Sequence, residues 1–182
     1  MPTLTTSRLL LRPWQEEDIN DLFAYSGSPL VGPMAGWPPH ADMHDAEAAL
    51  WDYIKHPHCF AIVLCDVGCV IGSIKLNPEC NRGRYFAKSL SYALSPMHWG
   101  HGYMTEAVGA VVTYAFETVG TELLSAFRYA ENVRSGRVLT KCGFTCEGVL
   151  PHTVMRYDGV PMQLVSYSMD RSEYDRFRQC VR

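Results

Sequence analysis

Two glycines in the middle of the chain could bind a phosphate. A predicted strand over residues 85–94 stops at Pro96, and Gly100 and Gly102 then lead directly into a helical pattern. Free backbone N–H groups and the positive end of a helix dipole meet at such a helix start. The stretch from Tyr92 to Ala107 is therefore expected to bind an anion.

The common nucleotide-binding motifs do not fit this stretch. The spacing of Gly100 and Gly102 begins like the dinucleotide fingerprint Gly-x-Gly-x-x-Gly, but its third glycine is Thr105. A dinucleotide site also needs an acidic residue at a strand end about 20 residues further on, and Glu122 precedes its strand. The Gly-Lys-Ser/Thr sequence of a phosphate-binding P-loop is absent.

A second pair of polar residues could take part in chemistry. Asn132 and Ser135 lie three apart at the start of a short predicted helix, so their side chains share one face. Asparagine and serine are also ordinary helix-capping residues. The spacing alone leaves both interpretations open, a reactive pair and a simple cap.

The elements that must position these residues follow from hydrophobic periodicity and turn residues. The predicted strands are residues 7–12, 59–65, 70–76, 85–94, 123–129, 144–149 and 162–169. The predicted helices are residues 15–26, 42–56, 104–119, 132–142 and 171–182. This order predicts an α+β fold, a mixed and largely antiparallel twisted sheet of about seven strands flanked by helices.

Two connecting segments carry further expectations. Residues 27–40 hold three Gly and four Pro around Trp37, which predicts a long loop, and such loops are often functional. Residues 77–84 are predicted to form a polar turn. In the helix predicted over residues 42–56, the apolar positions expected to face inward are Ala46, Leu50, Trp51 and Ile54.

Composition limits the classes of protein. The 182 residues and 47% hydrophobic content predict a single folded domain over residues 1–182. No apolar run reaches the roughly 18–20 residues that cross a bilayer, and no signal peptide is recognised. The seven cysteines form no Cys-x-x-Cys pair, which predicts reduced thiols and no metal. A net charge of −3 argues against nucleic-acid binding. We expect a cytoplasmic protein; a homodimer stays open.

Three motifs together resemble those of one family. Residues 99–107 read Trp-Gly-His-Gly-Tyr-Met-Thr-Glu-Ala, residues 132–144 fit Asn-x-x-Ser-x-Arg-Val-Leu-x-Lys-x-Gly-Phe, and residues 8–14 fit Arg-Leu-x-Leu-Arg-Pro-Trp. By these motifs essentially the whole chain resembles the GNAT acetyltransferase superfamily, in the branch containing the ribosomal-protein N-terminal acetyltransferases. Trp99 replaces a Gln or Arg and Met104 a small residue of the general pattern, which backbone contacts should tolerate.

The resemblance implies an N-acetyltransferase that uses acetyl-CoA as co-substrate, needs no metal and transfers acetyl directly to a primary amine. Main-chain groups at Tyr92 and Leu94 would bind the pantetheine amides by strand addition. Arg137 and Lys141 would meet the 3′-phosphate, with a solvated helix face as the alternative. The residues implied to hold the pyrophosphate are Trp99, Gly100, His101, Gly102, Tyr103, Met104 and Thr105.

The resemblance also assigns catalytic and acceptor roles. Asn132 would position the cofactor, and Ser135 would be the hydroxyl nearest the sulfur and the candidate general acid. Because serine is a weak acid, a water relay is compatible with this role. Trp37 and His40 lie in the loop that covers the acceptor in this family. With Asp42 and Asp45 they could hold a cationic peptide or a small amine; alternatively Trp37 simply packs under its own loop.

The expected general base is missing. Many relatives carry the frame Glu-x-Gly-Tyr on the strand before the phosphate loop, and Ser89 stands in place of its glutamate. An α-amine of pKa about 7.7–8.0 is already partly neutral at pH 7, whereas a lysine amine near 10.4 is almost wholly charged. The absence of this glutamate therefore favours an α-amine as the acceptor. Other proton acceptors considered are His98, His152 and Glu79; Glu106 is expected to be structural.

Three functions remain in view from sequence. The first is acetylation of a protein N-terminal α-amine, which the missing base favours. The second is acetylation of a small amine such as a polyamine or an aminoglycoside. The third is a non-catalytic acyl-CoA-binding module. Thiol release from acetyl-CoA with different acceptors separates the three.

Overall fold

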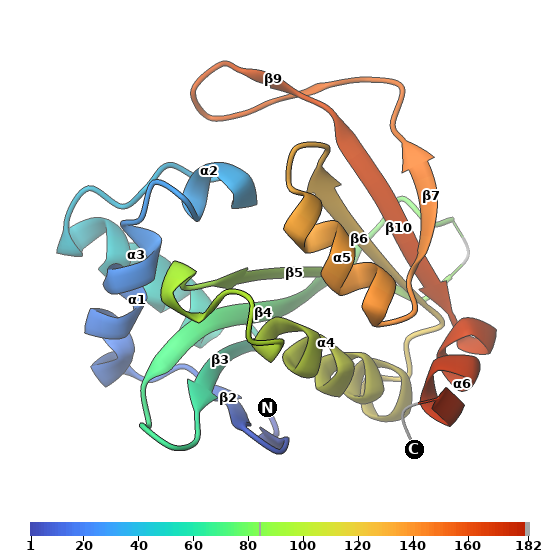
Figure 1. The fold of residues 1–182 in the computed structure, drawn as a ribbon, viewed down its shortest axis with the longest axis horizontal. Helices are drawn as coiled ribbons and strands as arrows, with labels where there is room; N and C mark the ends of the chain where they lie inside the picture. Colours follow the sequence, from blue (N-terminus) through green and yellow to red (C-terminus); the bar gives the residue numbers. More distant parts are fainter. Residues whose placement is uncertain (84, 181–182) are drawn as a thin grey trace.

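The computed structural model describes residues 1–83 and 85–180. Eight strands form one sheet in the order β1-β2-β3-β4-β5-β6-β10-β7, and β8 and β9 form a separate pair (Figure 1). The strands are β1 Leu4–Thr5, β2 Leu9–Pro13, β3 Cys59–Leu64, β4 Val70–Glu79, β5 Ala87–Leu94, β6 Leu123–Tyr129, β7 Thr145–Val149, β8 Val154–Met155, β9 Pro161–Met162 and β10 Leu164–Asp170. Neighbouring strands are antiparallel except β5 and β6, which are parallel. The predicted α+β fold is confirmed.

Helices cover both faces of this sheet. The helical segments are η1 Glu16–Asp18, α1 Ile19–Ser26, α2 Gly32–Ala35, α3 Met43–Lys55, η2 Pro96–His98, α4 Tyr103–Tyr114, the π-turn η3 Ala115–Val119, α5 Val133–Lys141 and α6 Arg171–Cys180. Figure 1 shows α1, α2 and α3 gathered at one end of the molecule and α4 running across its middle. In the described ranges, no helix is long and apolar enough to cross a membrane.

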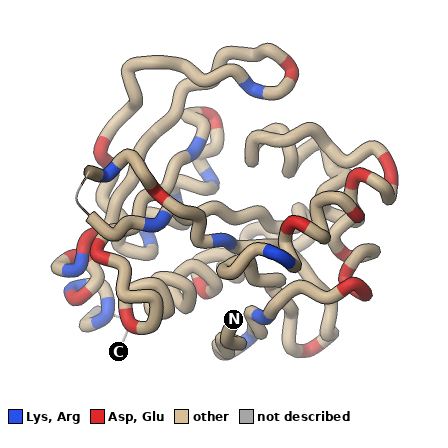
Figure 2. Tube along the Cα trace, turned by 180° about the vertical axis from the view of Figure 1, so that it is seen from behind, with Lys and Arg blue, Asp and Glu red and all other residues tan. Residues whose placement is uncertain are grey.

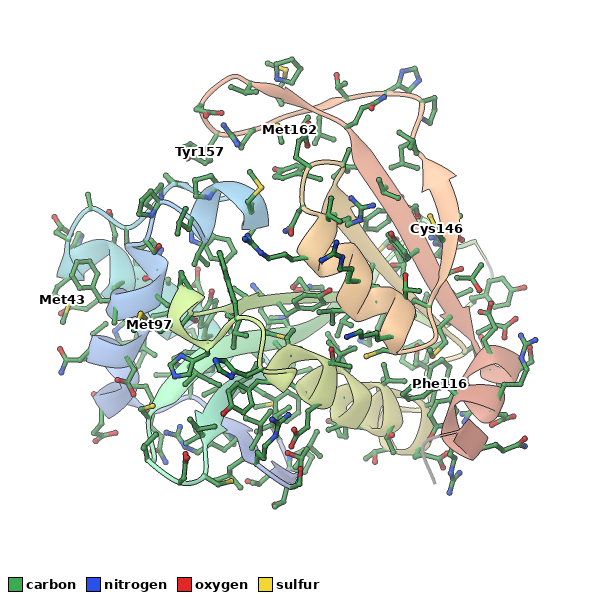
Figure 3. All side chains as sticks on the ribbon, viewed as in Figure 1. Met43, Met97, Phe116, Cys146, Tyr157 and Met162 are labelled. Carbon is green, nitrogen blue, oxygen red and sulfur yellow. The ribbon has the colours of Figure 1, made fainter. Side chains whose placement is uncertain are left out.

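Successive side chains of the strands point to opposite faces of the sheet, and this alternation produces two hydrophobic clusters. Phe60 and Ile62 of β3 face one cluster with α4, while Cys59 and Ala61 face the other with α1 and α3. The first cluster extends to α6, where the Phe116 ring stacks on Tyr174 at 4.7 Å between ring centroids. Figure 3 labels Phe116 next to α6. β3 and most of β4 are thus buried on both faces, whereas the edge strand β7 is largely exposed.

Four sequence predictions differ from the structure. The predicted turn over residues 77–84 is wrong at its start, because residues 77–79 pair with β5 and lengthen β4; Arg84 lies outside the described residues. The predicted loop 27–40 contains the short helix α2. Trp51 does not face inward but is 46% exposed, since α3 packs through its neighbour Leu50. The predicted strand 162–169 is split between β9 and β10, and the last two residues of the predicted tail helix lie outside the described residues.

The site depends on a divergence between two central strands. β5 and β6 pair only from Ala87–Leu123 to Leu90–Ala126. β5 continues to pair with β4 as far as Leu94, so over residues 91–94 its other edge has no strand partner among the described residues. Figure 1 shows the two strands running apart beyond this point. The divergence leaves open backbone in the middle of the sheet.

Candidate active site

A cavity of about 660 Å³ lies at the divergence of β5 and β6. Its size falls within the range of small-molecule sites. The walls come from the end of β5, the loop before α4, the end of β6, the first turns of α5, and α2 with Trp37. The lining residues that the sequence analysis had selected are Trp37, Tyr92, Leu94, His98, Trp99, Gly100, Gly102, Tyr103, Met104, Thr105, Asn132, Ser135, Arg137 and Lys141.

Two glycines shape the floor of this cavity at the start of α4. Gly100 and Gly102 have φ angles of 84° and 82°, a left-handed conformation that glycine adopts without steric cost. Gly102 is the N-cap residue of α4, and its helix start has no side-chain cap among the described residues. No side-chain cap therefore occupies the N–H groups of the first turn in the described structure, and they stay available to an anion.

Trp99 fixes the loop between β5 and α4. Its indole Nε1–H donates to the carbonyl oxygen of Leu94 at 2.9 Å. The guanidinium carbon of Arg134 lies 4.5 Å from the centroid of the Trp99 ring, which joins this loop to α5. Arg134 was not selected from sequence. The Leu94 carbonyl, implied to bind pantetheine, already accepts one hydrogen bond from the protein.

Tyr92 and Ser135 form a pair of hydroxyl groups across the cavity. The Tyr92 hydroxyl lies 2.9 Å from Ser135 Oγ and donates to the Ser135 carbonyl at 3.0 Å. Tyr92 as a whole is half-buried, but burial of its hydroxyl raises its pKa, against the smaller lowering effect of Ser135. Tyr92 therefore remains a neutral proton donor at physiological pH.

Asn132 makes the contacts of a helix cap. Its Oδ1 accepts from the Ser135 backbone N–H at 3.2 Å, and its Nδ2 donates to the Met34 carbonyl at 3.2 Å. The second contact joins α5 to α2 at the wall of the cavity. The cap predicted from sequence is thus present, and it leaves the Ser135 hydroxyl free to face Tyr92.

All charged residues that line the cavity are basic. They are Lys75, Arg128, Arg134, Arg137 and Lys141, and the lining given by the described residues contains no Asp or Glu. Arg128 is held by the protein, because its Nη1 donates to the carbonyls of Tyr129 and Ala130 at 3.0 and 2.7 Å. Such a cavity attracts a ligand with several negative charges.

Glu106 is part of the structure rather than of the cavity wall. Its Oε1 accepts from Thr6 Oγ1 at 2.6 Å and from the Arg8 backbone N–H at 2.9 Å, and its Oε2 pairs with Arg8 Nη2 at 2.6 Å. Partial burial raises the pKa of Glu106, but these hydrogen bonds together outweigh it and the pKa is lowered. Arg8 Nη1 also donates to the His101 carbonyl at 3.0 Å, which supports the glycine loop from behind.

We expect Glu106→Gln to lower the free energy of unfolding by about 2 kcal/mol, since it removes charge-assisted hydrogen bonds from a poorly exposed carboxylate. Urea unfolding followed by fluorescence measures this loss. At saturating acetyl-CoA, kcat should stay near the wild-type value. The exposed Glu131, changed to Gln, is the control for loss of a surface charge. A hundredfold fall in kcat for Glu106→Gln would instead make this carboxylate a catalytic base.

Some selected residues lie away from the cavity. His101 is exposed and absent from the lining, although its carbonyl supports the loop. His40 is also absent from the lining, and its backbone N–H donates to the Ser26 carbonyl at 3.2 Å. Of the three other proton acceptors considered, His98 lines the cavity. Glu79 accepts from Ser125 Oγ at 2.8 Å elsewhere, and His152 is exposed.

The site thus combines a helix start with left-handed glycines, a central strand with one open edge and five basic side chains, which suits a phosphorylated ligand. The acetyltransferase (GNAT) domain family matches residues 8–145. The N-acetyltransferase YoaA of Bacillus subtilis is 28% identical over 173 residues, covering 92% of this chain and 96% of YoaA. A GNAT-family acetyltransferase from Bacillus anthracis superposes with a TM-score of 0.84 at 18% identity, covering 94% of this chain and 99% of that one.

The chain belongs to the GNAT acetyltransferase family and is an acetyl-CoA-dependent N-acetyltransferase. Its fold is also that of the ribosomal-protein-S5-alanine acetyltransferase from Vibrio fischeri, with a TM-score of 0.78 at 18% identity over 96% of this chain and 99% of that one. As in other GNAT enzymes, the acetyl donor is acetyl-CoA and the acceptor is an amine.

Proposed function

We propose that the enzyme acetylates the α-amine of a protein N-terminus, as in the branch that contains the ribosomal-protein acetyltransferases. The observation that carries this proposal is the absence of Asp and Glu from the described lining of the cavity. Without a carboxylate base, the acceptor must arrive with a neutral amine. An α-amine does so at pH 7 far more often than a lysine side chain or a polyamine. The Vibrio fischeri protein with the same fold is a ribosomal-protein-S5-alanine acetyltransferase, which also favours a protein acceptor.

Pyrophosphate and pantetheine would lie along the residues selected from sequence. The backbone N–H groups of residues 100–105 would bind the phosphates, whereas the Trp99 N–H already donates to the Pro96 carbonyl at 3.2 Å; Arg137 and Lys141 on α5 suit the 3′-phosphate. Arg134, held against Trp99, adds a further cation on this wall. The open edge of β5 beyond Leu90 offers backbone groups to the pantetheine amides.

We propose that the acetyl group passes directly from acetyl-CoA to the amine, without a covalent enzyme intermediate. The described lining holds no cysteine that could carry the acetyl group. The neutral amine attacks the thioester carbonyl carbon, and the carbon–sulfur bond then breaks. Ser135, backed by the Tyr92 hydroxyl at 2.9 Å, protonates the departing thiolate and regains a proton through solvent. The extra proton on the nitrogen leaves to solvent or to His98, whose Nδ1 is buried without a hydrogen-bond partner in the described structure.

A panel of acceptors tests this function through thiol release from acetyl-CoA. We expect peptides with a free N-terminus to accelerate thiol release, and the same peptides with a blocked N-terminus to have no effect even when they contain lysine. Mass spectrometry should find the acetyl group on the α-nitrogen. Faster turnover of polyamines or aminoglycosides would contradict the proposal. Tight binding of acetyl-CoA with no accelerating acceptor would favour a binding module.

A further inference from the structure

One basic residue of the cavity, Lys75, is not among those that we propose bind coenzyme A. Lys75 lies on β4, with its Cα paired with that of Ser91 on β5. Arg134, Arg137 and Lys141 all come from α5, on the other side of the open edge of β5. Lys75 therefore lines the part of the cavity left to the acceptor.

The surroundings of Lys75 are polar and lack a carboxylate. The residue is half-buried, and its Nζ lies 5.0 Å from the centroid of the Tyr53 ring on α3. Asn77 Nδ2 donates to Ser91 Oγ at 3.0 Å on the same face of the sheet. Within the described part of the chain, no Asp or Glu forms an ion pair with Lys75. Burial, and then the charge of Lys75, lower the pKa of the neighbouring His56.

Asp42 and Asp45, which the sequence suggested could bind a cationic acceptor, accept backbone hydrogen bonds at the start of α3 instead. Asp42 Oδ1 caps α3 by accepting from the Asp45 N–H at 3.1 Å, and Asp45 Oδ2 accepts from the Ala41 N–H at 2.9 Å. Neither carboxylate lines the cavity. Figure 2 shows acidic positions along the outer side of the N-terminal helices and basic positions towards the middle of the molecule. At the acceptor end, the described cavity lining therefore offers Lys75 and no carboxylate.

We propose that the acceptor carries a carboxylate close to its reactive amine, and that Lys75 binds this carboxylate. This inference rests on the proposed function, under which the carboxylate is the side chain of an Asp or Glu beside the acetylated N-terminal residue. The α-carboxylate of a free amino acid would offer the same chemistry. Lys75 and Ser91 are directly opposite on neighbouring strands, about 5 Å apart at Cβ, so an acceptor beside the open edge of β5 is within reach of the Lys75 side chain. A polycationic acceptor would be repelled at the same place.

Kinetics with matched peptides test the role of Lys75. The probes are three peptides that differ only at the second residue, which is Glu, Ala or Lys, together with free amino acids and their methyl esters. We expect wild-type kcat/KM for the Glu peptide to exceed that for the Lys peptide by about tenfold or more, the ratio typical of one charge-assisted contact. Lys75→Gln should remove this difference mainly by raising KM for the Glu peptide. Lys75→Glu should reverse the preference.

Lys55→Gln is the matched control, because Lys55 is exposed at the end of α3 and absent from the cavity lining. It should keep the wild-type preference. Equal losses on all three peptides in Lys75→Gln would show a structural role and overturn the inference. A wild-type preference for the Lys peptide would overturn it too, while leaving N-terminal acetylation intact. Turnover of free amino acids but not of their methyl esters or of peptides would support carboxylate binding by Lys75 and refute the proposed function.

Discussion

Gly102→Ala is expected to raise the KM for acetyl-CoA by about tenfold or more. Gly102 is the N-cap of α4 with a φ of 82°, where an L side chain costs roughly 1–2 kcal/mol. A Cβ at this position would lie 3.6 Å from Arg8 Nη2, an ordinary contact, so the fold itself can accept the alanine. The new methyl group and the strained backbone would instead disturb the N–H groups that we propose bind the pyrophosphate. Steady-state kinetics and titration calorimetry with coenzyme A measure the effect.

Gly68→Ala is the control that separates backbone strain from loss of coenzyme A binding. Gly68 lies in the hairpin between β3 and β4 with a φ of 72°, and a Cβ there meets nothing within 4 Å. Its alanine variant should lose stability similar to that of Gly102→Ala while keeping the wild-type KM for acetyl-CoA. If both variants bind coenzyme A as well as the wild type, the helix start is not the phosphate site.

Ser135→Ala is expected to lower kcat by about a hundredfold, the lower end of what a general acid contributes. The helix cap should survive, because Asn132 accepts from the backbone N–H of Ser135 and not from its hydroxyl. KM for acetyl-CoA should therefore change little. A donor thioester with a more acidic thiol needs less help from an acid, so the loss should shrink with such a donor. The same dependence on the leaving group is expected of Tyr92→Phe, since the two hydroxyls lie 2.9 Å apart.

Two comparisons make this prediction decisive. Ser135→Ala with Tyr92→Phe should cost less than the sum of the two single changes, because the hydroxyls act together. Thr140→Ala removes an exposed hydroxyl from the same helix and should leave kcat unchanged. An unaltered kcat in a folded Ser135→Ala protein would exclude Ser135 as the acid, and its hydroxyl would then only support Tyr92.

Much of the site could be predicted because it depends on local backbone geometry. Left-handed glycines and a helix start are properties of a few consecutive residues, so Gly100, Gly102 and the Asn132 cap were recognisable in the sequence. The expected structural role of Glu106 agrees with its contacts to Thr6 and Arg8, although those partners came only with the structure.

Where the sequence predictions were wrong, pairing with distant segments was responsible. Asn77–Glu79 resemble a turn by composition, but the facing residues of β5 supply partners and extend β4. Trp51 is apolar enough for a core, yet it is exposed, because helix α3 packs against the protein through Ala46 and Leu50. Local propensity does not contain this information.

By itself, the sequence determined the left-handed glycines at the start of α4 and the capped start of α5, since each is fixed by neighbouring residues in the chain. Only the tertiary structure decided that Tyr92 meets Ser135, 43 residues away, and that β5 and β6 part beyond Leu90. Only the tertiary structure shows that Lys75 lies beside the open edge of β5, and that the carboxylates of Asp42 and Asp45 accept backbone hydrogen bonds at the start of α3. The charge that faces the acceptor depends on which side of the sheet each side chain reaches, and that is set by strand register and packing rather than by residue type.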